Sequence, residues 1–114
     1  KNLEERGIHV SVIDLFKLKP IDAQVLVRYL KGSRFLVTCE EHLLSGGMGS
    51  AVLEVLSDND FKIPTLRIGQ GDRFVFDYGG REVIWEKYGL DVASVTKKVS
   101  HFLEAQLKTD VLTV

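Results

Sequence analysis

The sequence predicts an α/β domain with a mainly parallel sheet, and three observations carry this prediction. Short apolar segments rich in β-branched residues alternate along the chain with segments of helical periodicity. Glycine or an acidic residue stands at most of the boundaries between these segments. Strands that alternate with helices need right-handed crossovers, which place helices on the faces of a parallel sheet. We therefore expect a three-layer α/β/α fold, with residues 1–114 forming a single domain.

The first expected elements lie before residue 32. Residues 1–6 are typical of the last turns of a helix that ends at Gly7. Residues 8–14 alternate apolar and polar side chains, which predicts a strand. Asp22 can cap a helix over residues 23–31. Because no strand precedes residues 1–6, we expect the chain to be a fragment of a longer protein that lacks its N-terminal strand or strands.

The middle of the chain predicts a strand–helix–strand succession. Residues 34–39 are mostly apolar, as in a strand covered on both faces, and residues 62–68 predict another strand. Between them, residues 48–57 carry an apolar stripe with helical spacing. A long glycine-containing loop over residues 69–80 follows.

Two helices are expected after this loop. A short one spans residues 81–87 and stops before Gly89, and Asp91 caps the last and most strongly amphipathic one. Residues 109–114 predict either a short strand or a frayed end.

Charge and composition exclude several classes of function. The net charge is −1, with 15 basic and 16 acidic residues, so no field for general nucleic-acid binding is expected. No apolar run reaches the length of a membrane span, and none near the start resembles a secretory signal. Cys39 is the only cysteine, which excludes an internal disulfide and favours a reducing, cytoplasmic location.

The glycine-containing loop before the helix at residue 48 is the sharpest local signal. A strand end that leads through glycines into a helix start can hold an anion, so a small phosphorylated ligand at Gly46 to Ser50 is one hypothesis. The dinucleotide pattern fails, because Val52 stands where its last small residue belongs, and no phosphate-loop lysine is present. The alternative is that Gly46, Gly47 and Gly49 let the helix pack closely.

The residues that follow the expected strand at 34–39 are candidates for chemistry. Glu40 and Glu41 are adjacent and should face opposite sides, so a loop anchor or an ion pair is favoured over an acid–base pair. His42 lies where open α/β sheets place ligands. A nucleophilic Cys39 with His42 as its base is a weaker hypothesis, because Cys39 is expected to be a buried small hydrophobe. The three histidines share no ligand spacing, so no metal site is expected.

The loop over residues 69–80 is rich in aromatic residues. Phe74, Phe76 and Tyr78 either fold inward over the sheet or form an apolar interface with another domain or subunit. Asp72 and Arg73 precede them and belong to the same candidate contact loop.

Four stretches, in the same order, resemble the C-terminal domain of the thiamine-diphosphate-dependent transketolase superfamily. They are the strand and Lys-Pro-Ile-Asp connector over 12–22, the loop and helix over 38–52, and the segments 68–74 and 79–91. Within the superfamily the chain is most similar to 1-deoxy-D-xylulose-5-phosphate synthases and to the C-terminal part of transketolases.

The resemblance implies an α/β/α domain with a five-stranded, mostly parallel sheet, which supports dimerisation and is inactive alone. It implies that the parent is a transferase whose other domains hold thiamine diphosphate and magnesium, so no catalytic residue, cofactor or metal is expected here. Upstream domains or a subunit of the same enzyme, and further copies in a homo-oligomer, are the expected partners. The interface or ligand-loop candidates are Glu40, Glu41, His42, Gly46, Gly47, Gly49, Asp72, Arg73 and Phe74.

Overall fold

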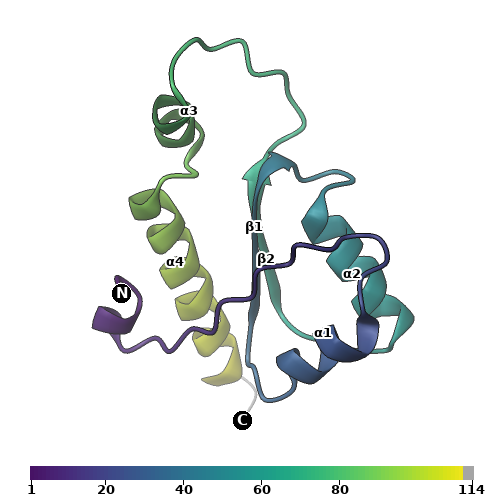
Figure 1. Cartoon of the computed structure of the whole chain (residues 1–114). Helices are drawn as coiled ribbons and strands as arrows, with labels where there is room; N and C mark the ends of the chain where they lie inside the picture. Colours follow the sequence, from purple (N-terminus) through teal and green to yellow (C-terminus); the bar gives the residue numbers. More distant parts are fainter. Residues whose placement is uncertain (112–114) are drawn as a thin grey trace. The chain divides into compact units, whose positions relative to one another are not determined.

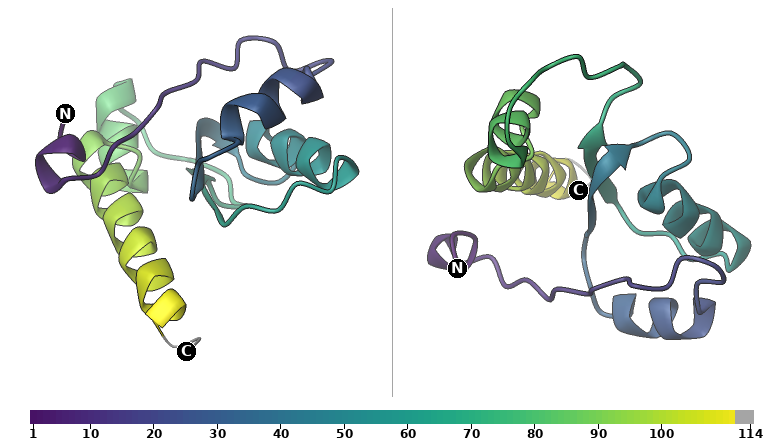
Figure 2. Two further views of the ribbon diagram at one scale, coloured as in Figure 1. Left: turned by 90° about the horizontal axis from the view of Figure 1, so that it is seen from below. Right: turned by 45° about the horizontal axis from the view of Figure 1, so that its top comes forward.

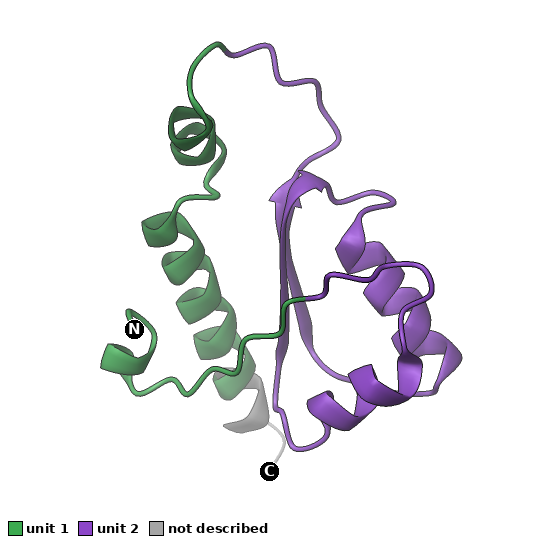
Figure 3. Cartoon of the chain, viewed as in Figure 1, with its two compact units in different colours: residues 1–14, 78–114 green, residues 15–77 purple. Residues whose placement is uncertain are grey.

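The computed structural model describes residues 1–111, with side chains for residues 1–107. The chain divides into two compact units (Figures 1 and 3), and each is described by itself. Unit 2 consists of residues 15–77, and unit 1 consists of residues 1–14 and 78–114.

Unit 2 is a parallel strand–helix–strand motif preceded by one helix. The strands β1 (Leu36–Leu43) and β2 (Thr65–Gln70) pair in parallel. Helix α2 (Met48–Asp58) forms the crossover between them, and α1 (Ala23–Leu30) comes before β1. The two helices lie next to each other on one face of the strands (Figure 2). This is the arrangement that the alternation of strands and helices predicts.

The core of unit 2 forms where α1 and α2 meet. Leu26 and Leu30 of α1 pack with Val52 and Leu56 of α2, and each of these side chains is at most 7% exposed. Their spacing of four residues places each pair on one face of its helix. Helix α1 begins as predicted, because the Asp22 carboxylate accepts a hydrogen bond from the Val25 N–H at 3.0 Å.

Unit 1 consists of three helical segments: the single 3-10 turn η1 (Glu4–Arg6), α3 (Arg81–Tyr88) and α4 (Val92–Val111). Gly7 and Gly89 end η1 and α3 in the left-handed conformation, as predicted for C-terminal glycines. The Arg6 side chain donates a hydrogen bond to the Ser100 hydroxyl of α4 at 3.4 Å.

The structure differs from the prediction at two segments and in the number of strands in the sheet. Residues 8–14 form no strand, because no described strand pairs with them, and Val12 is 90% exposed. The sheet in the described residues therefore has two strands, fewer than either the sequence or the family resemblance implies. The prediction for residues 109–114 is also wrong up to residue 111, where α4 continues, and residues 112–114 lie outside the described part.

Asp91 caps α4 as predicted, and this cap gives the chain a testable pH dependence. The Ser94 side chain and its backbone N–H, which donates at 3.0 Å, lower the pKa of Asp91 below 3.8. A lowered folded pKa means that the carboxylate stabilises the folded state above pH 3.8, and that this contribution disappears as the pH falls through the folded value.

We expect the Asp91→Asn variant to lose part of this pH dependence. Unfolding midpoints of the wild type and the variant should converge as the pH falls from 6 towards 2, and should differ most at the upper end of that range. A constant difference across the whole range would contradict the role of the carboxylate charge.

Candidate functional site

The best-defined polar cluster of the described residues lies where β1 leads into α2. Glu40 is the central residue. It is only 8% exposed, although its side chain ends in a carboxylate. Strand alternation explains this burial, because Thr38 and Glu40 point to the side of α2 while Cys39 points away. A buried carboxylate needs hydrogen-bond donors, and the start of α2 supplies them.

The Glu40 carboxylate closes the N-terminus of α2. One of its oxygens accepts a hydrogen bond from the Met48 N–H at 2.6 Å, and the other accepts one from the Gly49 N–H at 3.0 Å. The N-cap residue itself, Gly47, has no side chain that could do this. A negative charge at a helix N-terminus also interacts favourably with the helix dipole. Glu40 is thus a loop anchor, as the sequence analysis favoured.

Two glycines make room for this contact. A Cβ on Gly47 would lie 2.2 Å from a Glu40 carboxylate oxygen and 2.4 Å from the Leu43 carbonyl oxygen. A Cβ on Gly49 would lie 2.6 Å from the Thr38 hydroxyl. Gly46 is required for a different reason, since its φ is +71° and it faces open space.

Arg67 of β2 fastens the loop between β1 and α2 from the other strand. Its guanidinium donates hydrogen bonds to the Leu44 carbonyl and, at 2.8 Å, to the Ser50 hydroxyl. Ser50 in turn donates to the Leu44 carbonyl at 2.8 Å and accepts from the Gly46 N–H at 3.2 Å. Both strands therefore hold the loop and the start of α2.

Two polar atoms beside this network have no hydrogen-bond partner within the described part of the chain. They are the Thr38 hydroxyl and the Arg67 Nε, and both lie within 3 Å of the position that a Gly49 Cβ would occupy. Thr38 and Arg67 also stand opposite each other in the register of the strands. The other hydrogen bonds of the cluster hold the backbone of the loop and of the start of α2, or join the Arg67 and Ser50 side chains that do so.

Thr38, Arg67 and Gly69 were not among the predicted site residues, and Ser50 was predicted only as the end of the candidate anion-binding segment at Gly46 to Ser50. Gly69 lies on β2, where a Cβ would come within 2.8 Å of Leu44. The available signal was the recurrence of polar residues at alternate positions of otherwise apolar strands.

The structure does not unite the remaining candidates at β1 into a site. Glu41 and His42 are exposed, whereas Glu40 is buried, and the difference between Glu40 and Glu41 is that expected for adjacent strand positions. Cys39 is exposed, so the prediction that it is buried is wrong; strand alternation turns it to the face opposite α2. Cys39 and His42 are both exposed on β1, three positions apart, and this geometry gives no support to a nucleophile–base pair.

The aromatic loop is open to solvent. Phe74 is 84% exposed, Phe76 is 81% exposed and Tyr78 is 98% exposed, so the hypothesis that they fold inward is wrong. Asp72 and Arg73 are exposed as well. The rings of Phe74 and Phe76 contact each other with centroids 5.9 Å apart.

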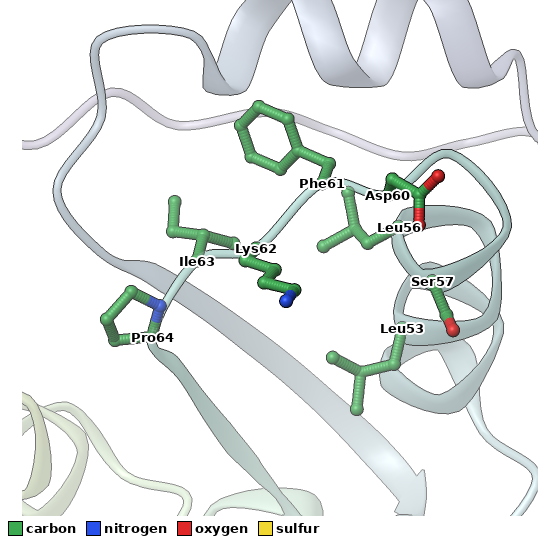
Figure 4. A pocket seen from close by; sticks show the side chains of 8 residues that line it. All are labelled: Leu53, Leu56, Ser57, Asp60, Phe61, Lys62, Ile63 and Pro64. Atoms are coloured by element: carbon green, nitrogen blue, oxygen red, sulfur yellow. The ribbon is translucent and has the colours of Figure 1, made fainter.

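A shallow apolar hollow lies at the other end of α2, where the chain turns towards β2 (Figure 4). It is lined by Leu53, Leu56, Ser57, Asp60, Phe61, Lys62, Ile63 and Pro64. Because it opens at the amino end of β2, it lies away from the carboxyl ends of the strands, where open α/β sheets bind ligands. It contains none of the candidate residues.

Within the described residues, no group of three or more His, Cys, Asp or Glu side chains is placed to hold a metal ion. No helix in that part of the chain has the length and apolar character needed to cross a membrane.

The parallel strand–helix–strand unit, with its glycine-rich and Glu40-capped crossover, defines a small α/β domain. The chain belongs to the transketolase C-terminal domain family, whose model matches residues 1–95. It is similar to the 1-deoxy-D-xylulose-5-phosphate synthase of Syntrophotalea carbinolica, with 39% identity over 89% of this chain. It is also similar to that of Thermomicrobium roseum, with 41% identity over 89% of this chain. In both cases the match covers 16% of the relative.

A solved structure is similar as well. It is the inactive β4 tetramer of a split-gene transketolase, which is 41% identical, with a TM-score of 0.77 over 90% of this chain and 33% of that chain. The chain thus spans less than a fifth of the two synthases and a third of the split-gene chain.

Proposed function

We propose that the chain is the C-terminal, non-catalytic assembly domain of a cytoplasmic thiamine-diphosphate-dependent transferase. Its parent would be a 1-deoxy-D-xylulose-5-phosphate synthase or a transketolase. The family match and the similarity to the synthases support this proposal. The observation that carries the non-catalytic role is the use of Glu40, because both of its carboxylate oxygens accept hydrogen bonds from backbone N–H groups at the start of α2.

The residues present do not fit thiamine diphosphate or magnesium. A diphosphate needs free donors, and the N–H groups of Met48 and Gly49 are already bound to Glu40. Magnesium needs converging carboxylates, and the described residues bring no such group together. The same occupied amides argue against the alternative function, a module that binds a small phosphorylated ligand at Gly46 to Ser50. In our proposal the cofactor belongs to other domains of the parent enzyme.

The proposal includes self-association of the chain. It is supported by the exposed Phe74, Phe76 and Tyr78 and by the similarity to a chain that forms a β4 tetramer. The other candidate contact residues, Glu41, His42, Asp72 and Arg73, are exposed too and are proposed to line contacts with partner domains.

Two measurements on the purified chain test this function. With pyruvate, glyceraldehyde 3-phosphate, thiamine diphosphate and Mg²⁺ we expect no product above that of a protein-free reaction. In sedimentation equilibrium we expect the apparent mass to rise above that of one chain as the concentration increases. Turnover by the chain would overturn the non-catalytic role, and a monomer at every concentration would overturn the self-association.

A further inference from the structure

The segment of residues 73–77 in unit 2 lies outside the helices and strands and has an unusual distribution of side chains. Phe74 and Phe76 are highly exposed, whereas Val75 between them is only partly exposed. This alternation is that of a strand, with the two phenyl rings on one face. Yet within the described residues no hydrogen bond reaches the backbone of Phe74, Val75 or Phe76. The stretch from Phe74 to Phe76 therefore has the side-chain alternation of a strand, and no strand of the described residues pairs with it.

The sequence of this segment is complementary to itself when read in the opposite direction. In an antiparallel pair of two copies centred on Val75, each residue lies opposite the one equally far on the other side. Phe74 then faces Phe76 of the second copy, and Arg73 faces Asp77 of the second copy. Aromatic pairs and opposite charges are the side-chain pairs that stabilise antiparallel strands.

Each face of such a pair would bring together side chains that suit one another. One face would gather four phenyl rings, Phe74 and Phe76 from each copy. The other would place Val75 against its own copy, between two pairs of Arg73 and Asp77. A register centred on Phe76 would keep aromatic pairs, with Phe76 against its own copy and Phe74 against Tyr78, but it would set Val75 against Asp77 and Arg73 against Gly79, so the pairing of opposite charges would be lost. The single chain already shows the ring contact of Phe74 with Phe76, at 5.9 Å.

We propose that residues 73–77 are an isologous docking strand, which pairs antiparallel with the same segment of a second copy of this chain across a two-fold axis at Val75. This rests on the proposed self-association and names the surface that provides it. A two-fold axis is the usual symmetry of a dimer and requires a self-complementary patch. The proposal does not require Arg73 or Asp77 to be unpaired in the single chain. Exposed ion pairs contribute little free energy, so these side chains can exchange their partners when two copies meet.

Charge reversal with mixing tests the register. In Arg73→Asp, two acidic residues face each other twice across the axis, and in Asp77→Arg two basic residues do so. We expect each variant alone to dimerise about tenfold more weakly than the wild type, because two attractive pairs become repulsive. An equimolar mixture should recover wild-type affinity, because every facing pair then has opposite charges. Recovery in the mixture can arise only between chains.

A disulfide tests the position of the axis. In a Cys39→Ser background, which removes the exposed native thiol, Val75→Cys should form a cross-linked dimer under mild oxidation. Directly opposite Cα atoms of antiparallel strands lie about 4.5–5.5 Å apart, which a disulfide can span. Asp72→Cys is the matched control, because it lies about 20 Å from its own copy in this register.

The outcomes separate the docking strand from the proposed function. Suppose that the wild-type chain self-associates. If the mixture then binds no more tightly than either variant alone, or if Val75→Cys cross-links no faster than Asp72→Cys, the docking strand alone is overturned. Docking of the segment on another domain of the enzyme would give that same result. A wild-type chain that stays monomeric overturns the self-association, and the docking strand with it.

Discussion

The Gly47→Ala variant is expected to lose about 3 kcal/mol of unfolding free energy. Its φ of −80° suits alanine, so backbone strain is not the cause. The added Cβ would lie 2.2 Å from the Glu40 carboxylate and 2.4 Å from the Leu43 carbonyl oxygen. The first contact is with a buried group that is tied to α2, and the second is with backbone, so neither can move without breaking the helix cap. Urea unfolding followed by circular dichroism measures the loss.

Gly80→Ala is the matched control. Gly80 is also an N-cap, that of α3, with φ of −69°, and nothing lies within 4 Å of the position of its Cβ. It shares with Gly47 the general effect of replacing an N-cap glycine by alanine, and it lacks the clash. We expect its unfolding free energy to change by less than about 1 kcal/mol. Equal losses in the two variants would show that the close approach of Glu40 to Gly47 has no energetic weight.

The Glu40→Gln variant is expected to lose about 2–3 kcal/mol of unfolding free energy. The substitution preserves size but removes the charge, and it turns one acceptor oxygen into an NH₂ group that would face a backbone N–H. One of the amides of Met48 and Gly49 would then be buried without an acceptor, and the interaction with the helix dipole would disappear. Chemical denaturation measures this loss too.

Glu41→Gln is its control, because it makes the same chemical change one residue along at an exposed position. Exposed carboxylates contribute little, so a change below about 1 kcal/mol is expected. If Glu40→Gln proved as mild as Glu41→Gln, the capping role of Glu40 would be refuted.

The parts of the fold that sequence predicts well depend on local interactions. Asp22 caps α1, Asp91 caps α4, and Gly7 and Gly89 end their helices in the left-handed conformation. Each of these depends on a residue and a backbone group a few positions away, so the sequence neighbourhood contains the whole interaction. The helices over 23–30, 48–58 and 81–88 were predicted within one residue at either end for the same reason.

The parts that could not be predicted depend on distant partners. Residues 8–14 have the composition of a strand, but a strand also needs a neighbour, and nothing in the pattern says whether one is present. The fate of Cys39 depends on which face of β1 the helices cover, and an apolar run does not specify a face. Strand β1 extends beyond the expected end because Glu40, a polar residue, is satisfied by amides eight and nine positions later.

The candidate site shows the same division. From the sequence, close packing was one of two hypotheses for Gly46, Gly47 and Gly49, and a loop anchor or an ion pair was favoured for Glu40 and Glu41. The donor–acceptor pairs were not predicted, because they join β1 to α2 and Arg67 of β2 to the same loop, and Arg67 lies 23 positions from Leu44. Spacing along the chain cannot reveal a contact that the parallel pairing of two strands creates.

The double attachment of α2 has a consequence for how unit 2 opens. The first turn of a helix ordinarily frays before the rest, since its N–H groups have no partners within the helix. Here the Glu40 carboxylate of β1 and the Arg67 guanidinium of β2 form hydrogen bonds with that turn and with the loop before it. Loosening this end of the helix therefore requires breaking hydrogen bonds to side chains of both strands, so we expect the first turn of α2 to open less readily than an uncapped helix end.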